Sequence, residues 1–255
     1  MAEERRTVKA AETVCDIVDV LEDRGEVGVT ELADEIGLHK STIHTYLNTL
    51  RQRNYVVKEG TSYRLSLRYL SLSRHVSQDF GAYPVIKSEL DVLANETEEV
   101  SQFATKEQGR LVYVYKAEGQ GAVHTATDVG SVNFFHCTGL GKVILAHSSA
   151  AFLDEIVERD GLSRKTDNTI TSREALEDEL RAVREDGYAI DDEEAISGLR
   201  CVAAPVFECH DASILLGAVS VSGPAQRVDD ERIESELLPR VLQTANVIEL
   251  QYLAG

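Results

Sequence analysis

The chain has 255 residues, which is enough to bury a substantial core in one large domain or in two smaller ones. It contains no apolar run of about 18 residues and no apolar segment after its first residues, so the sequence predicts neither a transmembrane helix nor a signal peptide. The cysteines are too few and too scattered for a disulfide scaffold: Cys15, Cys137, Cys201 and Cys209. We therefore expect a cytoplasmic protein with reduced thiols and no membrane partner.

The formal net charge of −18 is distributed unevenly along the chain. Residues 1–80 carry 11 basic and 13 acidic side chains, whereas residues 81–255 carry 15 and 31. Within residues 38–74 there are seven basic side chains and one acidic side chain, Glu59. A basic stretch in an acidic chain is typical of a phosphate-binding face, although a chance cluster on a solvated helix has the same composition.

The acidity of the remaining chain suggests a halophilic protein. With one methionine and no tryptophan, the composition favours an origin in a high-salt cytoplasm, where a dense carboxylate surface maintains solubility. This hypothesis predicts that the stability of the fold rises with molar KCl.

The first residues are predicted to form two helices and a short strand. Val8–Glu22 places its apolar side chains on one stripe, which indicates a first helix. Val27–Val29 can form a small strand, and we expect Thr30 to cap a second helix, Glu31–Ile36. A tight turn follows that second helix.

A third helix, Leu38–Arg53, is predicted to be amphipathic. Ile43, Leu47 and Leu50 recur at helical spacing and form its apolar face. The opposite face is small, polar and basic, and it includes Ser41, His44, Thr45, Asn48 and Arg51. Short hydroxyl, amide and imidazole groups can reach base edges in a DNA major groove without keeping the backbone away, so we interpret this segment as a recognition helix.

A β-hairpin is predicted to follow the recognition helix. Tyr55–Lys58 and Tyr63–Leu65 alternate as strands around a loop that contains Gly60. The order of helix, helix, turn, helix and hairpin within about 60 residues is the winged form of helix-turn-helix. We therefore expect residues 1–65 to form a DNA-binding domain.

A linker helix is predicted at Ser66–Gln78, within residues 66–80, because Gly81 and Pro84 break the helical pattern. Residues 81–255 then alternate helical and strand-like patterns, which indicate an α+β domain with one mainly antiparallel sheet. Its strands are predicted at Val100–Lys106, Arg110–Lys116, Val123–Thr127, Leu199–Phe207 and Ile214–Ser222. Its helices are predicted at Val85–Asn95, Leu140–His147, Ala150–Arg159, Arg173–Asp186 and Asp229–Leu253.

Three motifs together resemble the IclR family of transcription regulators: LADEIGLHKSTIHTYLNTL with the predicted hairpin, HCTGLGKVILA, and GLRCVAAPVF followed by GAVSVSGP. The resemblance covers residues 8–253 in the family's order and spacing. It implies an N-terminal winged helix-turn-helix, a linker helix and a C-terminal GAF-like domain that binds a small, usually anionic, metabolite. It also implies a homodimer or a dimer of dimers, without a cofactor, that acts as a repressor or as an activator.

We expect two kinds of contact between the winged domain and double-stranded operator DNA. Base contacts are expected from the polar face of the recognition helix: Ser41, Thr42, His44, Thr45 and Asn48. Phosphate contacts are expected from basic side chains: Lys40, Arg51, Lys58 and Arg64. In a dimer, two recognition helices would face a pseudo-palindromic operator.

The motif HCTGLGKVILA places three small or apolar residues, Gly139, Leu140 and Gly141, at a loop-to-helix junction. Amides without an intrahelical partner and the positive end of the helix dipole favour a carboxylate or phosphate there. In the family, Gly139 and Leu140 resemble the pair whose amides hold the effector carboxylate. A phosphate-loop nucleotide site is excluded, since no glycine stands five residues before Gly141 and Val143 replaces the required Ser or Thr. The alternative is that the glycines only allow close packing of the helix on the sheet.

The remaining effector-contacting positions of the family match Asp191, Cys201, Ser220 and Ser222. Their carboxylate and hydroxyl groups suit a small keto or hydroxy acid, and they favour a sugar-derived acid over an aromatic one. Two alternatives stay open. Cys201 has the sequence context of a buried, inert thiol, and the acidic run at residues 191–194 has that of a solvated loop.

Soft ligands for zinc occur at His136, Cys137, Cys201, Cys209 and His210, but without Cys-x-x-Cys or His-x-x-x-His spacing, so no metal is expected. Cys137 and His136 are adjacent and would point to opposite faces of a strand, so they are not expected to act as nucleophile and base. The sequence thus favours a regulator. The alternatives are a metabolite-binding protein or enzyme whose winged domain only pairs chains, and a constitutive DNA-binding protein with an empty sensor domain.

Overall fold

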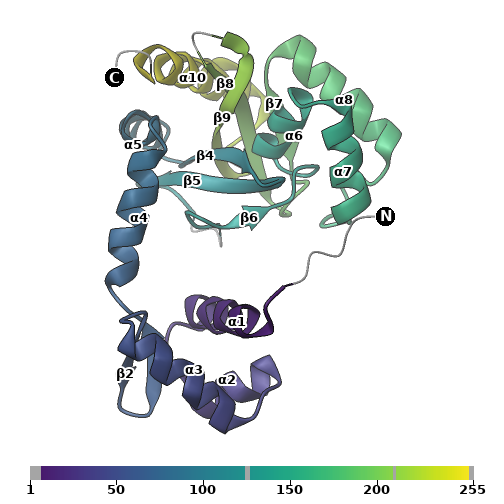
Figure 1. Ribbon diagram of the computed structural model, residues 1–255. Helices are drawn as coiled ribbons and strands as arrows, with labels where there is room; N and C mark the ends of the chain where they lie inside the picture. The colour runs from purple at the N-terminus through teal and green to yellow at the C-terminus, as the bar shows by residue number, and fades with distance from the viewer. Residues whose placement is uncertain (1–6, 124–126, 209–210, 253–255) are drawn as a thin grey trace. The chain divides into compact units, whose positions relative to one another are not determined.

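The computed structural model describes residues 7–123, 127–208 and 211–252 (Figure 1). The chain forms two compact units, Met1–Asp79 and Phe80–Gly255. Over the described ranges, no helix is both long enough and apolar enough to cross a bilayer.

The first unit contains a helix-turn-helix followed by a wing. Its described elements are α1 (Lys9–Arg24), β1 (Val27–Gly28), α2 (Val29–Ile36), α3 (Lys40–Gln52), β2 (Val56–Glu59), β3 (Ser62–Leu65) and α4 (Arg68–Asp79). The three strands pair antiparallel in the order β1-β3-β2. Two residues, Gly60 and Thr61, join β2 to β3, and Gly60 has a φ of 58° that such a tight hairpin requires. The winged helix-turn-helix predicted from the sequence is confirmed.

The start of α2 differs from the prediction that Thr30 caps the helix. Helix α2 already includes Thr30, and Gly28 is its N-cap. The carboxylate of Glu31 reaches back, and its Oε2 accepts a hydrogen bond from the Gly28 N–H at 3.0 Å. A carboxylate in the first turn satisfies a backbone donor and faces the positive end of the helix dipole, so no Thr30 cap is needed.

The core of the first unit lies between the sheet and helices α1, α2 and α3. Ile17, Leu32, Ile43, Leu47 and Tyr63 are almost fully buried in it. Because this core takes the apolar stripe of α3, the polar stripe of that helix is left on the surface.

The second unit has the predicted α+β architecture. Its described strands are β4 (Val100–Glu107), β5 (Arg110–Glu118), β6 (Val132–Asn133), β7 (Ala189–Asp192), β8 (Leu199–Glu208) and β9 (Asp211–Pro224). Its described helices are α5 (Tyr83–Thr97), α6 (Gly139–Ala146), α7 (Ala150–Asp160), α8 (Arg173–Asp186), α9 (Asp230–Arg232), the π-helical segment η1 (Ile233–Leu237) and α10 (Leu238–Tyr252).

The strands of the second unit form one antiparallel sheet in the order β6-β5-β4-β9-β8-β7. Side chains alternate between its two faces, so each strand contributes to two cores. Phe103, Val202 and Val219 belong to the core with α5 and α10, while Ala104 and Ala203 belong to the core with α6 and α8. Figure 1 shows the sheet between these two groups of helices. The small alanines let α6 approach the sheet closely.

Three segments of the second unit differ from the sequence prediction. Strands β6 and β7 were not predicted, since two to four residues at the edges of a sheet carry little periodic signal. Val123 and Thr127, at the ends of one predicted strand, lie outside any strand, and residues 124–126 lie outside the described residues. The single C-terminal helix predicted at 229–253 is divided by the π-helical segment, and its last residue also lies outside the described part.

Candidate functional sites

The exposed face of α3 carries the side chains predicted to contact DNA. Lys40, Ser41, His44, Thr45 and Arg51 are exposed. Two others of the predicted set, Thr42 and Asn48, are half-buried, because they border the apolar stripe of the helix. The surface formed by these seven side chains contains hydroxyl, imidazole, amide and basic groups.

Hydrogen bonds along α3 order part of this surface. Asn48 Nδ2 lies 3.0 Å from His44 Nδ1, so the amide donates to the ring nitrogen in the tautomer that leaves Nδ1 unprotonated. The Thr45 hydroxyl donates to the Ser41 carbonyl at 3.0 Å. The Asn48 carbonyl and the far nitrogen of the His44 ring therefore stay available to a base edge.

The two basic residues of the wing differ in their surroundings. Lys58 is exposed, and its Nζ lies 5.8 Å from the centre of the Tyr63 ring. Arg64 is half-buried, donates from Nε to Glu59 Oε1 at 2.7 Å and donates from Nη1 to the Leu65 carbonyl at 3.1 Å. The only acid of the basic stretch thus neutralises one of the side chains predicted to contact phosphate.

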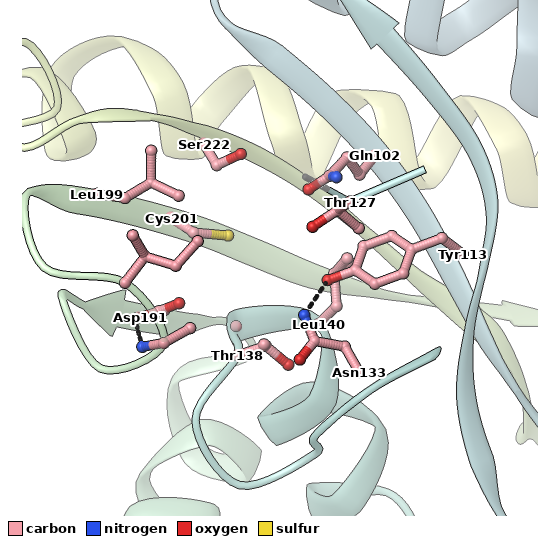
Figure 2. A pocket seen from close by; sticks show the side chains of 13 residues that line it. Gln102, Tyr113, Thr127, Asn133, Thr138, Leu140, Asp191, Leu199, Cys201 and Ser222 are labelled. Carbon is pink, nitrogen blue, oxygen red and sulfur yellow. Dashed lines mark hydrogen bonds between the residues drawn. The ribbon is translucent and has the colours of Figure 1, made fainter. Parts of the chain in front are cut away.

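A pocket opens on the face of the sheet that α6 covers (Figure 2). Its empty volume of about 420 Å³ includes solvent at its open mouth. Its walls come from the six strands of the sheet, from their adjoining loops and from the first turn of α6. The lining residues are Gln102, Tyr113, Thr127, Asn133, Thr138, Gly139, Leu140, Asp191, Ala195, Ile196, Leu199, Cys201 and Ser222.

The first turn of α6 presents backbone amides to this pocket. Thr138 is the N-cap: its Oγ1 accepts from the Gly141 N–H at 3.1 Å and donates to the Phe134 carbonyl at 2.9 Å. The N–H groups of Gly139 and Leu140 belong to the same turn and have no acceptor within the helix. Both residues line the pocket, at the positive end of the helix dipole.

Both glycines of this turn also permit close packing. A Cβ on Gly139 would stand 3.1 Å from Cys201 Sγ, and a Cβ on Gly141 would stand 2.4 Å from the Phe135 carbonyl oxygen. The packing explanation and the ligand explanation for these glycines are therefore compatible, since close packing brings the amides of α6 to the floor of the pocket.

Asp191 lies on strand β7 and is only 5% exposed. Its Oδ1 accepts from the Glu194 N–H at 2.8 Å and from the Ala195 N–H at 3.3 Å. Burial raises the pKa of Asp191 to about 7, although the two backbone hydrogen bonds act in the opposite direction. The solvated acidic loop considered for residues 191–194 is therefore wrong for Asp191 and for Glu194, which is also buried.

A buried lysine holds the loop that follows Asp191. Lys142 of α6 is 1% exposed, and its Nζ donates to Glu194 Oε1 at 2.5 Å, to Glu179 Oε1 of α8 at 2.7 Å and to the Ile190 carbonyl at 2.5 Å. These acceptors raise the pKa of Lys142 against the effect of burial, so the ammonium group stays charged. The network joins α6, α8 and β7 behind the pocket.

Of the predicted effector residues on β8 and β9, two line the pocket and one does not. Cys201 and Ser222 face each other across the two strands, and both line the pocket. Ser220 pairs with Ala203, is fully buried and is not a lining residue. Burial raises the pKa of the Cys201 thiol to about 12, so it is neutral at physiological pH, as expected for an inert thiol.

Several lining residues, Gln102 and Tyr113 among them, were not predicted from the sequence. Gln102 on β4, Tyr113 on β5 and Asn133 on β6 line the pocket, and Asn133 Nδ2 donates to Tyr113 Oη at 3.3 Å. One signal was available: Gln102 is a polar residue on a strand face where the residues on either side of it, Val100 and Ala104, are apolar. Tyr113 lies on the predicted strand Arg110–Lys116, where an aromatic side chain is equally typical of a core.

The described residues contain no group of three His, Cys, Asp or Glu side chains that could hold a metal ion. Cys209 and His210, two of the ligands considered for zinc, lie outside the described part. His136 Nε2 lies 3.1 Å from the Ser163 carbonyl. Burial raises the pKa of Cys137 to about 12, so this thiol is not activated as a nucleophile.

Family models match both units of the chain. Residues 11–60 match the IclR helix-turn-helix domain, and residues 78–250 match the model described as "Bacterial transcriptional regulator IclR C-terminal". The chain is 31% identical to the HTH-type transcriptional regulator KdgR of Escherichia coli over 89% of this chain and 87% of that protein. It is 30% identical to the "Probable HTH-type transcriptional regulator ArcR" of Halobacterium salinarum, over 97% and 95%.

Solved structures share the fold of the whole chain. The IclR of Thermotoga maritima superposes with a TM-score of 0.78 at 28% identity, covering 96% of this chain and 97% of that one. An IclR homologue from Microbacterium hydrocarbonoxydans complexed with 4-hydroxybenzoate superposes with a TM-score of 0.84 at 19% identity, covering 97% and 100%. At this level of identity, the second likeness concerns the fold.

Proposed function

Because the chain belongs to the IclR family of transcriptional regulators, we propose that a small anionic metabolite, such as a keto or sugar acid, switches its affinity for an operator. Members of this family are regulators and not enzymes. One observation carries the effector part of the proposal. A pocket meets the first-turn amides of a helix N-terminus in the same chain as a winged helix-turn-helix.

For DNA, we assign the exposed face of α3 to the major groove. Ser41, Thr42, His44, Thr45 and Asn48 would read base edges, and Lys40, Arg51, Lys58 and Arg64 would contact phosphates. The hydrogen bond of the His44–Asn48 pair supports this assignment, since it orders the two side chains and does not use the amide carbonyl or the second ring nitrogen. Arg64 would reach a phosphate by exchanging its Glu59 partner, so its net contribution is smaller than that of Arg51.

For assembly, we propose a homodimer, or a dimer of dimers, in which α4 pairs with its copy. Leu67, just before α4, and Leu70 and Val76 within it are apolar residues with exposed fractions of 75%, 68% and 67%. None of the residues of α4 is buried. A helix with no buried side chain is stabilised by a partner, and a second copy would set two α3 helices against a pseudo-palindromic operator.

For the effector, we propose that its carboxylate accepts hydrogen bonds from the N–H groups of Gly139 and Leu140. The side chains of Asp191, Cys201 and Ser222 would then bind the adjacent keto or hydroxyl group. Ser220, which is fully buried, would pack behind them. An acid that binds one arrangement of this GAF-like domain more tightly shifts the population toward that arrangement, and α4 transmits the change to α3.

We also propose that the protein works in a cytoplasm of high salt. The net charge of −18 supports this assignment, and so does the likeness to a relative from Halobacterium. In molar salt, counterion release contributes less to DNA affinity, so base contacts and dimer geometry would supply more of it.

The proposal is tested by selection of bound sequences from a random DNA library with the full-length protein, followed by titration of the selected site. We expect an enriched inverted repeat, a protein mass of a dimer or tetramer, and a change of affinity of at least about fivefold with one acid of a keto- and sugar-acid panel. No enriched sequence would contradict the DNA reading. Enrichment without any response to an acid would indicate a constitutive DNA-binding protein.

A further inference from the structure

Strand β4 places a buried polar side chain against the pocket. Gln102 is only 7% exposed, and it lines the pocket from the face of the sheet that α6 covers. Its carboxamide has no hydrogen-bond partner among the described residues. This side chain opens on the pocket, so its amide is suited to hydrogen-bond a ligand that enters there.

Gln102 stands at a distance from the first turn of α6. Gly139 packs against Cys201 on β8, whereas Gln102 is on β4, with β9 between these two strands. Two strand spacings separate Cys201 from Gln102, or about 10 Å between the backbones. A ligand whose carboxylate is bound at α6 must therefore extend across the sheet to reach Gln102, which favours an acid of more than three carbons.

The far end of the pocket is polar and uncharged. Gln102, Thr127 and Tyr113 lie together on one side of the pocket in Figure 2, opposite Asp191, Leu199 and Cys201. Tyr113 is tied to Asn133, and burial raises its pKa, so its hydroxyl stays neutral. Among the described residues that line this pocket, none is a Lys, an Arg or a His. A second carboxylate would find no counter-charge among these described lining residues, and an apolar ring would leave the Gln102 amide without a hydrogen bond.

We propose that Gln102 is a specificity-determining residue that hydrogen-bonds a hydroxyl group on the tail of the effector. The effector is then an acid of more than three carbons, with a carboxylate at one end and hydroxyl groups along the other. This inference rests on the proposed function, because it takes the first turn of α6 as the carboxylate site. It adds a second contact point, which selects among acids that share the carboxylate.

Four probe acids test the inference on the full-length protein: D-gluconate, hexanoate, lactate and 4-hydroxybenzoate. Isothermal titration should give the tightest binding for gluconate, which alone offers a hydroxylated tail long enough to reach Gln102. Gln102→Leu should weaken gluconate by at least about fivefold and leave lactate within about twofold. Gln102→Asn, which keeps the amide but is one methylene shorter, should give an intermediate loss.

Thermal melting without ligand provides the control for folding. Gln102→Leu replaces an amide that opens on the pocket with an apolar side chain of similar size, so its Tm should stay close to that of the wild type. The inference is overturned if hexanoate or 4-hydroxybenzoate binds as tightly as gluconate, or if Gln102→Leu weakens all bound acids equally or none of them. If none of the four acids binds, the effector part of the proposed function fails as well, and operator binding by the same preparation still tests the DNA part.

Discussion

Gly139 at the start of α6 lies so close to Cys201 on β8 that a Cβ at position 139 would stand 3.1 Å from the Cys201 sulfur. Ala203 is nearly as close, at 3.2 Å from the same point. Since both neighbours are side chains on the sheet, this contact sets how deeply the first turn of α6 sits in the pocket. Gly139 therefore determines both the packing of α6 and the position of the amides that we propose as the carboxylate site.

A double-mutant cycle tests that contact. Gly139→Ala should lower the free energy of unfolding by about 1–3 kcal/mol, because the added methyl group forces its neighbours to shift. Cys201→Ala removes the sulfur, so the double variant should be more stable than the sum of the single changes by at least about 0.5 kcal/mol. Urea denaturation of the four proteins measures this coupling. Strict additivity would mean that the two residues do not press on each other.

A second prediction concerns the pH dependence of stability. Burial raises the pKa of Asp191 to about 7, so the folded chain holds this proton more tightly than the unfolded chain. The stabilisation is therefore complete below about pH 4 and is lost as the pH rises to about 7. The variant Asp191→Asn cannot titrate at this position, and its side-chain carbonyl can accept the same bonds from the N–H groups of Glu194 and Ala195.

The measurement is the difference in unfolding free energy between wild type and Asp191→Asn from about pH 4 to about pH 8. The wild type should lose on the order of 3 kcal/mol relative to the variant across this window, with little further change above it. Glu194, whose pKa is also raised, and the charged Lys142 behind it are present in both proteins, so they contribute to the difference only through their interaction with Asp191. A difference that does not vary with pH would contradict the buried position of Asp191.

A third prediction concerns the buried lysine. Lys142→Met removes the charge that Glu194 and Glu179 share, and it leaves Glu194 buried without a counter-ion. We expect a loss of about 3–5 kcal/mol in the free energy of unfolding. Adding Glu194→Gln removes the uncompensated carboxylate and should restore part of that loss. If the second change gives no recovery in chemical denaturation, the two side chains are not coupled as the geometry requires.

A fourth prediction concerns the wing. Glu59→Gln releases the Arg64 guanidinium from its ion pair, so DNA affinity should rise by a similar factor for all sequences. The same change in an Arg64→Ala background should have a smaller effect on DNA affinity.

Asn48→Ala, in contrast to these changes in the wing, should relax sequence specificity. Fluorescence anisotropy on operator and random duplexes separates these results, and a gain limited to the operator would contradict a phosphate role for Arg64.

A fifth prediction follows from the acidic surface. The Tm of the protein should rise as KCl is increased from about 0.1 M toward molar concentration, because salt screens the repulsion between carboxylates. This repulsion acts over about 10 Å at 0.1 M and over about 3 Å at 1 M. Thermal melts monitored by circular dichroism provide the measurement. A Tm that stays level or falls over this range would argue against adaptation to high salt.

Local sequence patterns predicted much of the fold. The apolar stripe of α3, the hairpin around Gly60 and the boundaries of α8 all follow from residues a few positions apart, and each is present in the structure. Predictions failed where short elements depend on neighbours distant in the chain. The strand β7 is an example, since its acidic residues indicate a loop until β8 is seen to pair with it.

The sequence by itself determined the winged helix-turn-helix, the antiparallel α+β unit and the helix junction at Gly139, because helical and strand periodicity and glycine at a turn act over short distances. Only the tertiary structure decided which polar groups share a pocket, since the order of the strands brings Gln102, Asp191 and Ser222 to one face of the sheet. The same holds for charge. Whether Asp191 is solvated or buried, and whether Arg64 is free or paired, depends on what packs against each side chain.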